Sequence, residues 1–134
     1  TITLALAEHA KTAIGVEIVP EAIENAKRNA LRNGMENTEF FCADAGQAAQ
    51  RLAKRGIDVL VVDPPRAGLA PEAIDLIAST SARDVAYVSC DPATLARDLK
   101  CFVEEGTFSP VKITPVDLFP QTFHCETVVH LKRN

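Results

Sequence analysis

The chain has 134 residues, of which 47% are hydrophobic and 24% charged. This ordinary globular usage excludes a disordered, collagen-like or coiled-coil chain, and the length suits a single domain over residues 1–134. Apolar runs such as Val59–Val62 are too short to cross a bilayer, and no signal-peptide pattern is present. We therefore expect one cytoplasmic domain without a membrane partner.

The charge and cysteine content limit the possible partners and sites. Fourteen Lys and Arg against eighteen Asp and Glu give a net charge of −4, so the chain lacks the positive field that would by itself draw it onto phosphates. Six Phe, one Tyr and no Trp disfavour a base-stacking platform. The four cysteines, Cys42, Cys90, Cys101 and Cys125, form no Cys-x-x-Cys pair, so we expect no metal site.

Apolar β-branched runs alternate with helical patterns along the chain, which is typical of a doubly wound α/β sheet. Residues 1–7 already have a helical pattern, although the strand that comes before the helix in a βαβ unit is not part of this sequence. The chain therefore opens inside a βαβ unit. The expected strands are Ala13–Ile18, Glu39–Ala43, Asp58–Val62, Val85–Ser89, Val111–Val116 and Thr127–Leu131, and the expected helices are Pro20–Arg32, Ala45–Lys54, Pro71–Ser79 and Pro92–Glu104.

Two acidic residues stand at the ends of the first two expected strands. Ligands of such folds bind at the carboxyl ends of the strands. Glu17 ends the first complete strand, where a carboxylate can accept hydrogen bonds from both hydroxyls of a ribose; alternatively it is an acid that faces water. Asp44 closes the next strand, where it either accepts from an adenine amino group or caps the following helix.

The segment Asp63-Pro64-Pro65-Arg66 follows the apolar strand that ends at Val62. Its two prolines fix the backbone and remove two donors, so they hold Asp63 at the strand tip and stiffen the loop beside a ligand pocket. The alternative is a plain proline-rich turn. Amine methyltransferases with related loops usually have an aromatic residue in the fourth position, so Arg66 argues against that class.

Cys90 stands between a strand and a helix. Asp91 is suited to cap that helix and Pro92 to its first turn, so the thiol is expected at the positive end of the helix dipole. This position favours the thiolate and makes Cys90 a candidate nucleophile. By contrast, Cys42 lies in a strand and is expected to belong to the core, and Cys101 lies inside a helix and is expected to be structural.

His124 and Glu126 stand just before the last strand, in a loop that can reach the same edge of the sheet as Cys90. Taken alone, both residues are typical of a solvated or structural loop. Cys125 between them is expected to be packed rather than reactive.

The order of these segments resembles the bacterial RNA (uracil-5-)-methyltransferases, and more closely those that modify 23S ribosomal RNA than the transfer-RNA enzyme. The resemblance runs nearly end to end. It implies a Rossmann-like S-adenosylmethionine-dependent methyltransferase fold, a three-layer α/β/α arrangement with a mostly parallel sheet. The segments that carry it are Gly15-Val16-Glu17, Asp63-Pro64-Pro65-Arg66, residues 89–98 and residues 119–127.

The resemblance also implies a role for each candidate residue. Glu17 would bind the ribose of S-adenosylmethionine, Asp44 would lie by its adenine, and Asp63 would line the pocket between its methionine moiety and the target base. Cys90 matches the nucleophile that adds to carbon 6 of uracil, and Glu126 matches the base that removes the carbon-5 proton. The expected product is 5-methyluridine, in a loop or flipped-out uridine of RNA.

The sequence departs from the family at its beginning. Family members have an RNA-binding region, a strand and a glycine-rich loop upstream, and this sequence starts after them. The missing strand would lie between the strands that end at Glu17 and Asp63. We therefore expect this chain to be a fragment of a catalytic domain, and we expect the full-length protein to bind the RNA. The alternative is a non-catalytic fragment that self-associates through its open sheet, while a dehydrogenase is disfavoured because no Gly-x-Gly-x-x-Gly segment is present.

Overall fold

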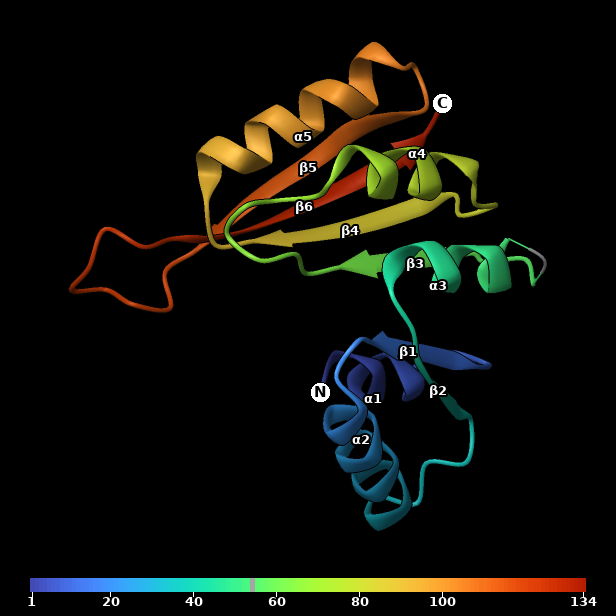
Figure 1. Ribbon diagram of the computed structural model, residues 1–134. Coiled ribbons are helices and arrows are strands. Elements are labelled where there is room, and N and C mark those ends of the chain that lie inside the picture. Colours follow the sequence, from blue (N-terminus) through green and yellow to red (C-terminus); the bar gives the residue numbers. More distant parts are fainter. Residues whose placement is uncertain (54) are drawn as a thin grey trace. The chain divides into compact units, whose positions relative to one another are not determined.

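The computed structural model describes residues 1–53 and 55–134. Within them the chain forms two compact units, an N-terminal unit (Thr1–Ala48) and a C-terminal unit (Ala49–Asn134), each with its own sheet (Figure 1). The last residue of one expected helix, Lys54, lies outside the described residues. The assignment of residues 1–134 to a single domain stays a prediction.

The N-terminal unit is a βαβ unit with one additional helix. β1 and β2 pair in parallel, from Ala13 opposite Thr38 to Glu17 opposite Cys42, and α2 forms the crossover that a parallel pair requires. α2 ends at Arg32 with Asn33 as its C-cap, and Gly34 follows with a φ of +64°, which is a common way to end a helix. The elements are α1 (Ile2–Ala7), β1 (Ala13–Glu17), α2 (Pro20–Arg32) and β2 (Thr38–Cys42).

Close packing in this unit depends on Gly15 in β1. A Cβ atom at this position would lie 2.7 Å from Oγ1 of Thr3 in α1 and 2.8 Å from Cδ1 of Phe40 in β2. Both distances are shorter than a normal van der Waals contact. Glycine therefore allows a helix and the neighbouring strand's aromatic ring to approach β1 together.

The C-terminal unit contains a four-stranded mixed sheet with the strand order β3-β4-β6-β5. β3 and β4 are parallel, whereas β6 is antiparallel to both β4 and β5. α3 (Ala45–Leu52) leads from one unit into the other. The remaining elements are β3 (Val59–Val62), α4 (Pro71–Ser79), β4 (Asp84–Ser89), α5 (Pro92–Glu104), β5 (Phe108–Val116) and β6 (Glu126–Arg133).

α4 and α5 cover the same face of this sheet (Figure 1). Phe102 of α5 meets Phe108 of β5 edge-on, with ring centroids 5.8 Å apart, and the Arg133 guanidinium lies 4.4 Å from the centre of the Phe108 ring. Burial of this apolar face is the main source of stability of the unit. Its buried residues are Ile74, Ile77, Val85, Tyr87, Leu95, Phe102, Phe108, Val129 and Leu131.

The six expected strands and four expected helices are all present, and α2, α4 and α5 have the predicted bounds. β5 begins at Phe108 rather than Val111, because it is an edge strand and tolerates Pro110 through a bulge before Lys112. The prediction that Cys42 belongs to the core is wrong, because its side chain is exposed at the end of β2.

None of the helices in the described part of the chain is long and apolar enough to span a membrane.

We expect Gly15→Ala to destabilise the chain, because the added methyl group would overlap with Thr3 and Phe40. Overpacking of this kind costs about 1–3 kcal/mol. Thermal unfolding followed by circular dichroism measures the change. Val16→Ala alters the exposed neighbour on the same strand and is the control; equal unfolding midpoints for the two variants would contradict the packing described here.

Candidate functional site

Three of the five predicted site residues lie at one edge of the four-stranded sheet. Asp63 follows β3 and Cys90 follows β4, and these strands are parallel, so both residues stand at the same edge. β6 runs antiparallel to β4 and begins at this edge with Glu126. The fold therefore brings three residues to one end of the sheet, although Asp63 and Glu126 are 63 positions apart in the sequence.

The register of β4 and β6 places the thiol and the carboxyl group on facing positions. The last paired residues are Ser89 and Thr127, and continuing this register by one residue sets Cys90 opposite Glu126. Opposed Cα atoms in antiparallel strands are about 4.5–5.5 Å apart. Both residues are half-buried, so each remains accessible from solvent.

A network of short-range hydrogen bonds fixes the turn that carries Cys90. The buried Ser89 hydroxyl accepts from the Asp91 N–H at 3.1 Å and donates to the Asp91 carbonyl at 3.0 Å. The Asp91 carboxylate accepts from the N–H groups of Ala93 and Thr94 at 2.9 and 3.0 Å. These bonds, first that from Thr94, lower the pKa of Asp91, and the predicted helix cap is confirmed.

The loop after β3 meets the loop before β6. Nη2 of Arg66 lies 3.4 Å from Nε2 of His124, and the ring of His124 packs against that of Phe123 with centroids 4.3 Å apart. Asp63 at the start of the first loop is exposed. The prediction that the His124 loop reaches the edge occupied by Cys90 is confirmed.

Two further cysteines are packed, as predicted. Sγ of Cys125 lies 3.3 Å from the carbonyl oxygen of Glu126 and 3.9 Å from that of Val116, and Cys101 packs against the core beneath α5. Among residues 1–53 and 55–134, no cluster of His, Cys, Asp and Glu is suited to hold a metal ion.

Glu17 and Asp44 belong to the N-terminal unit, where Glu17 is the last residue of β1 and Asp44 follows β2. Oε1 of Glu17 accepts from the N–H groups of Ile18 and Val19 at 2.8 and 3.1 Å. Oδ1 of Asp44 accepts from the Gln47 N–H at 2.7 Å, so Asp44 does cap α3. Each carboxylate has a second oxygen that can accept further bonds.

Comparison with known families identifies the family of this chain. The model of the tRNA (uracil-5-)-methyltransferase family matches residues 1–134. The chain belongs to this family. It is 50% identical to an uncharacterized RNA methyltransferase of Clostridium acetobutylicum and 49% identical to one of Bacillus cereus, in each case over 99% of the chain and 29% of the relative. It thus spans less than a third of the length of these relatives.

Solved structures agree with the predicted fold. The tRNA (uracil-54, C5)-methyltransferase of Pyrococcus abyssi, solved with S-adenosyl-L-homocysteine, is 34% identical with a TM-score of 0.79, over 94% of this chain and 30% of that one. The tRNA (m1A22) methyltransferase assigned to Streptococcus pneumoniae, solved with S-adenosyl-L-methionine, is 14% identical with a TM-score of 0.74, over 99% and 61%. The Rossmann-like methyltransferase fold is therefore confirmed.

One buried polar residue, Asp98, is not among the residues that the sequence pattern predicted. Asp98 is wholly buried on the inner face of α5, together with Leu95 and Phe102. The spacing of these three residues is that of the apolar face of a helix. A carboxylate on such a face was the available signal, because a buried charge requires hydrogen-bond partners.

We expect Glu126→Cys to form a disulfide bond with Cys90 under mild oxidation, because opposed positions have the Cα separation that a disulfide requires. The variant is made in a Cys125→Ser background, and peptide mass spectrometry detects the linked residues 90 and 126. Thr127→Cys is the matched control, since residue 127 pairs with Ser89 and faces the other side of the sheet. Equal linkage in both variants would contradict the register.

Proposed function

We propose that this chain is the catalytic part of an S-adenosylmethionine-dependent enzyme that converts uridine in RNA to 5-methyluridine. The observation that supports the proposal is the pairing of β4 and β6, whose last pair is Ser89 and Thr127, so that Cys90 and Glu126 follow on facing positions at the end of the sheet where β3 leads into Asp63. A nucleophile and a base on facing positions are what this reaction needs. Membership in the family supports the same reaction.

Cys90 is proposed to act first, because carbon 5 of uracil is too weak a nucleophile by itself. The thiolate adds to carbon 6, a carbon–sulfur bond forms, and the electrons of the carbon 5–carbon 6 double bond move into an enolate. Carbon 5 thereby becomes nucleophilic. When bound, S-adenosylmethionine would supply the electrophilic methyl group that carbon 5 takes.

Glu126 is proposed to complete the reaction. Its carboxylate removes the proton from the methylated carbon 5, and the electron pair of that bond restores the double bond as the Cys90 thiolate leaves carbon 6. Both residues return to their starting forms once Glu126 releases its proton. The base must reach the ring that the thiol holds, and facing positions on neighbouring strands meet this requirement.

Glu17, Asp44 and Asp63 are proposed to hold the cofactor. The exposed acid Glu17 can accept from ribose hydroxyls, and its neighbour Ile18 is 66% exposed, which offers an apolar surface to a flat adenine ring. Asp44 can accept from the adenine amino group with the oxygen that does not cap α3. Asp63 follows β3 at the edge that carries Cys90, which suits a position between the methionine moiety and the target base.

The RNA substrate is proposed to be 23S ribosomal RNA. The whole protein is proposed to bind this RNA in the cytoplasm. Because this chain has a net charge of −4, segments of the protein outside it are proposed to provide most of the electrostatic attraction to the RNA phosphates. The Pyrococcus abyssi enzyme acts on tRNA at uracil 54, so methylation assays on both RNA classes decide between these substrates.

We expect Glu126→Gln in the whole protein to accumulate a covalent complex with RNA, because the adduct cannot lose its carbon-5 proton. Turnover should fall by at least about 10²-fold. Denaturing gels and mass spectrometry detect the complex and locate it at Cys90. Cys125→Ser alters the neighbouring thiol and should keep turnover. A stable wild-type enzyme that forms no adduct with 5-fluorouridine RNA would contradict the mechanism.

Self-association is a second candidate property of the isolated chain. In the described part of the chain, β3 pairs only with β4, and β1 pairs only with β2. The outer edge of β3 therefore has N–H and C=O groups that no strand of its sheet pairs with, and such groups are a template for another strand. A second copy of the chain can supply that strand, and in that state the isolated chain is proposed to be inactive.

We expect the isolated chain to form dimers or larger species as its concentration rises. Multi-angle light scattering at increasing concentration measures this mass. Val61→Pro places a residue without an N–H group in β3 and should lower the association, while circular dichroism verifies that the variant remains folded. A monomer at all concentrations would contradict self-association.

A further inference from the structure

The buried carboxylate of Asp98 lies on the second turn of α5, apart from the proposed catalytic and cofactor-binding residues. Asp98 has no exposed surface. Its Oδ2 accepts from the Tyr87 hydroxyl at 2.6 Å and from the Leu69 N–H at 2.8 Å, and its Oδ1 accepts from Nε and Nη2 of Arg97 at 2.9 and 2.7 Å. Burial and the bond to Asp98 raise the pKa of the Tyr87 hydroxyl, which therefore stays a donor.

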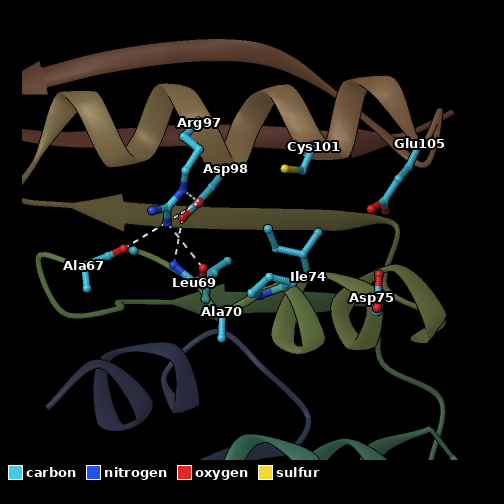
Figure 2. A pocket seen from close by; sticks show the side chains of 11 residues that line it. Ala67, Leu69, Ala70, Ile74, Asp75, Arg97, Asp98, Cys101 and Glu105 are labelled. Carbon is cyan, nitrogen blue, oxygen red and sulfur yellow. Dashed lines mark hydrogen bonds and ion pairs between the residues drawn. The ribbon is translucent and has the colours of Figure 1, made fainter.

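Arg97 and Thr94 extend these contacts to the loop between β3 and α4. Nη2 of Arg97 donates to the carbonyl oxygens of Ala67 and Leu69 at 2.8 and 3.3 Å (Figure 2). Oγ1 of Thr94 donates to the carbonyl oxygen of Arg66 at 3.0 Å. Side chains from the first two turns of α5 thus bind three carbonyl groups and one N–H group of this loop.

Gly68 allows the loop to approach α5 this closely. Its φ is +76°, and a Cβ atom there would lie 2.5 Å from Nη2 of Arg97 and 2.6 Å from Oδ2 of Asp98. No side chain fits between the loop backbone and the ion pair. The loop and the helix are therefore in direct contact at this point.

We propose that Arg97 and Asp98 are positioning residues, which hold the loop of residues 63–70 so that Asp63 and Arg66 keep a fixed place relative to Cys90. The inference rests on the proposed function. The loop begins at Asp63, and α5 begins two residues after Cys90. Contacts between this loop and the first turns of this helix therefore set the spacing of Asp63 and Arg66 from Cys90, and Arg97 and Asp98 need not touch the substrate themselves.

Arg97 is the suitable residue to test, because its removal opens no closed cavity. Its side chain is 53% exposed, and it borders an open groove of about 490 Å³ between α4 and α5 (Figure 2). Arg97→Ala should therefore fold, while the loop loses its bonds to two carbonyl groups. Arg97→Lys keeps the charge and can restore one of these bonds.

The experiment measures the single-turnover rate of adduct formation with 5-fluorouridine RNA, at saturating RNA and cofactor, in the whole protein. We expect Arg97→Ala and Gly68→Ala to lower this rate on the order of 10²-fold, with partial rescue in Arg97→Lys. Hydrogen exchange of the Leu69 N–H should be faster in Arg97→Ala, which reports on the loop without reference to activity.

Gly106→Ala is the matched control for Gly68→Ala. Gly106 has a similar φ of +68°, but a Cβ atom there meets nothing within 4 Å, so the substitution adds backbone strain without disturbing the network. Its rate should stay within about twofold of the wild type. A wild-type rate in Arg97→Ala would overturn the positioning role. A wild-type protein that forms no adduct would instead refute the proposed function, and the positioning role with it.

Discussion

The antiparallel ladder between β4 and β6 is the constraint on which the rest of the site depends. It brings the last strand of the chain beside the strand that carries Cys90, and its register sets Glu126 on the facing position. A shift of one residue would turn Glu126 to the other face of the sheet, where α4 and α5 pack. The burial of Val85, Tyr87 and Val129 on that face makes such a shift unfavourable, so the core also specifies the geometry of the site.

Local chemistry made much of this fold predictable. Pro20, Pro71 and Pro92 each mark a first helical turn, and Asp91 caps α5 through contacts within three residues. Such signals are short-range, so a sequence displays them directly. The bounds of α2, α4 and α5 follow from them.

Features that depend on distant residues were not predictable in the same way. A strand pattern reveals an extended backbone but not which neighbours cover each side chain, so Cys42 was assigned to the core although it is exposed. The hydrogen bond from the Leu69 N–H to Asp98 joins residues 29 positions apart. A local sequence pattern does not predict such a bond. The facing positions of Cys90 and Glu126 likewise require the register of two strands, which only the folded sheet supplies.

The surroundings of Cys90 refine the idea that its helix favours a thiolate. Pro92 has no N–H group, and the N–H groups of Ala93, Thr94 and Leu95 already bond to Asp91. The helix therefore offers the sulfur its dipole field rather than free donors. Asp63, Asp91 and Glu126 are acidic residues at the same end of the sheet. The pKa of Asp91 is lowered first by the N–H group of Thr94 and to a smaller extent by the cation Arg66, so Arg66 is a positive charge that acts on this end of the sheet. Its carbonyl oxygen is held by Thr94, so the contacts that order the loop also anchor the backbone of the residue that supplies this charge.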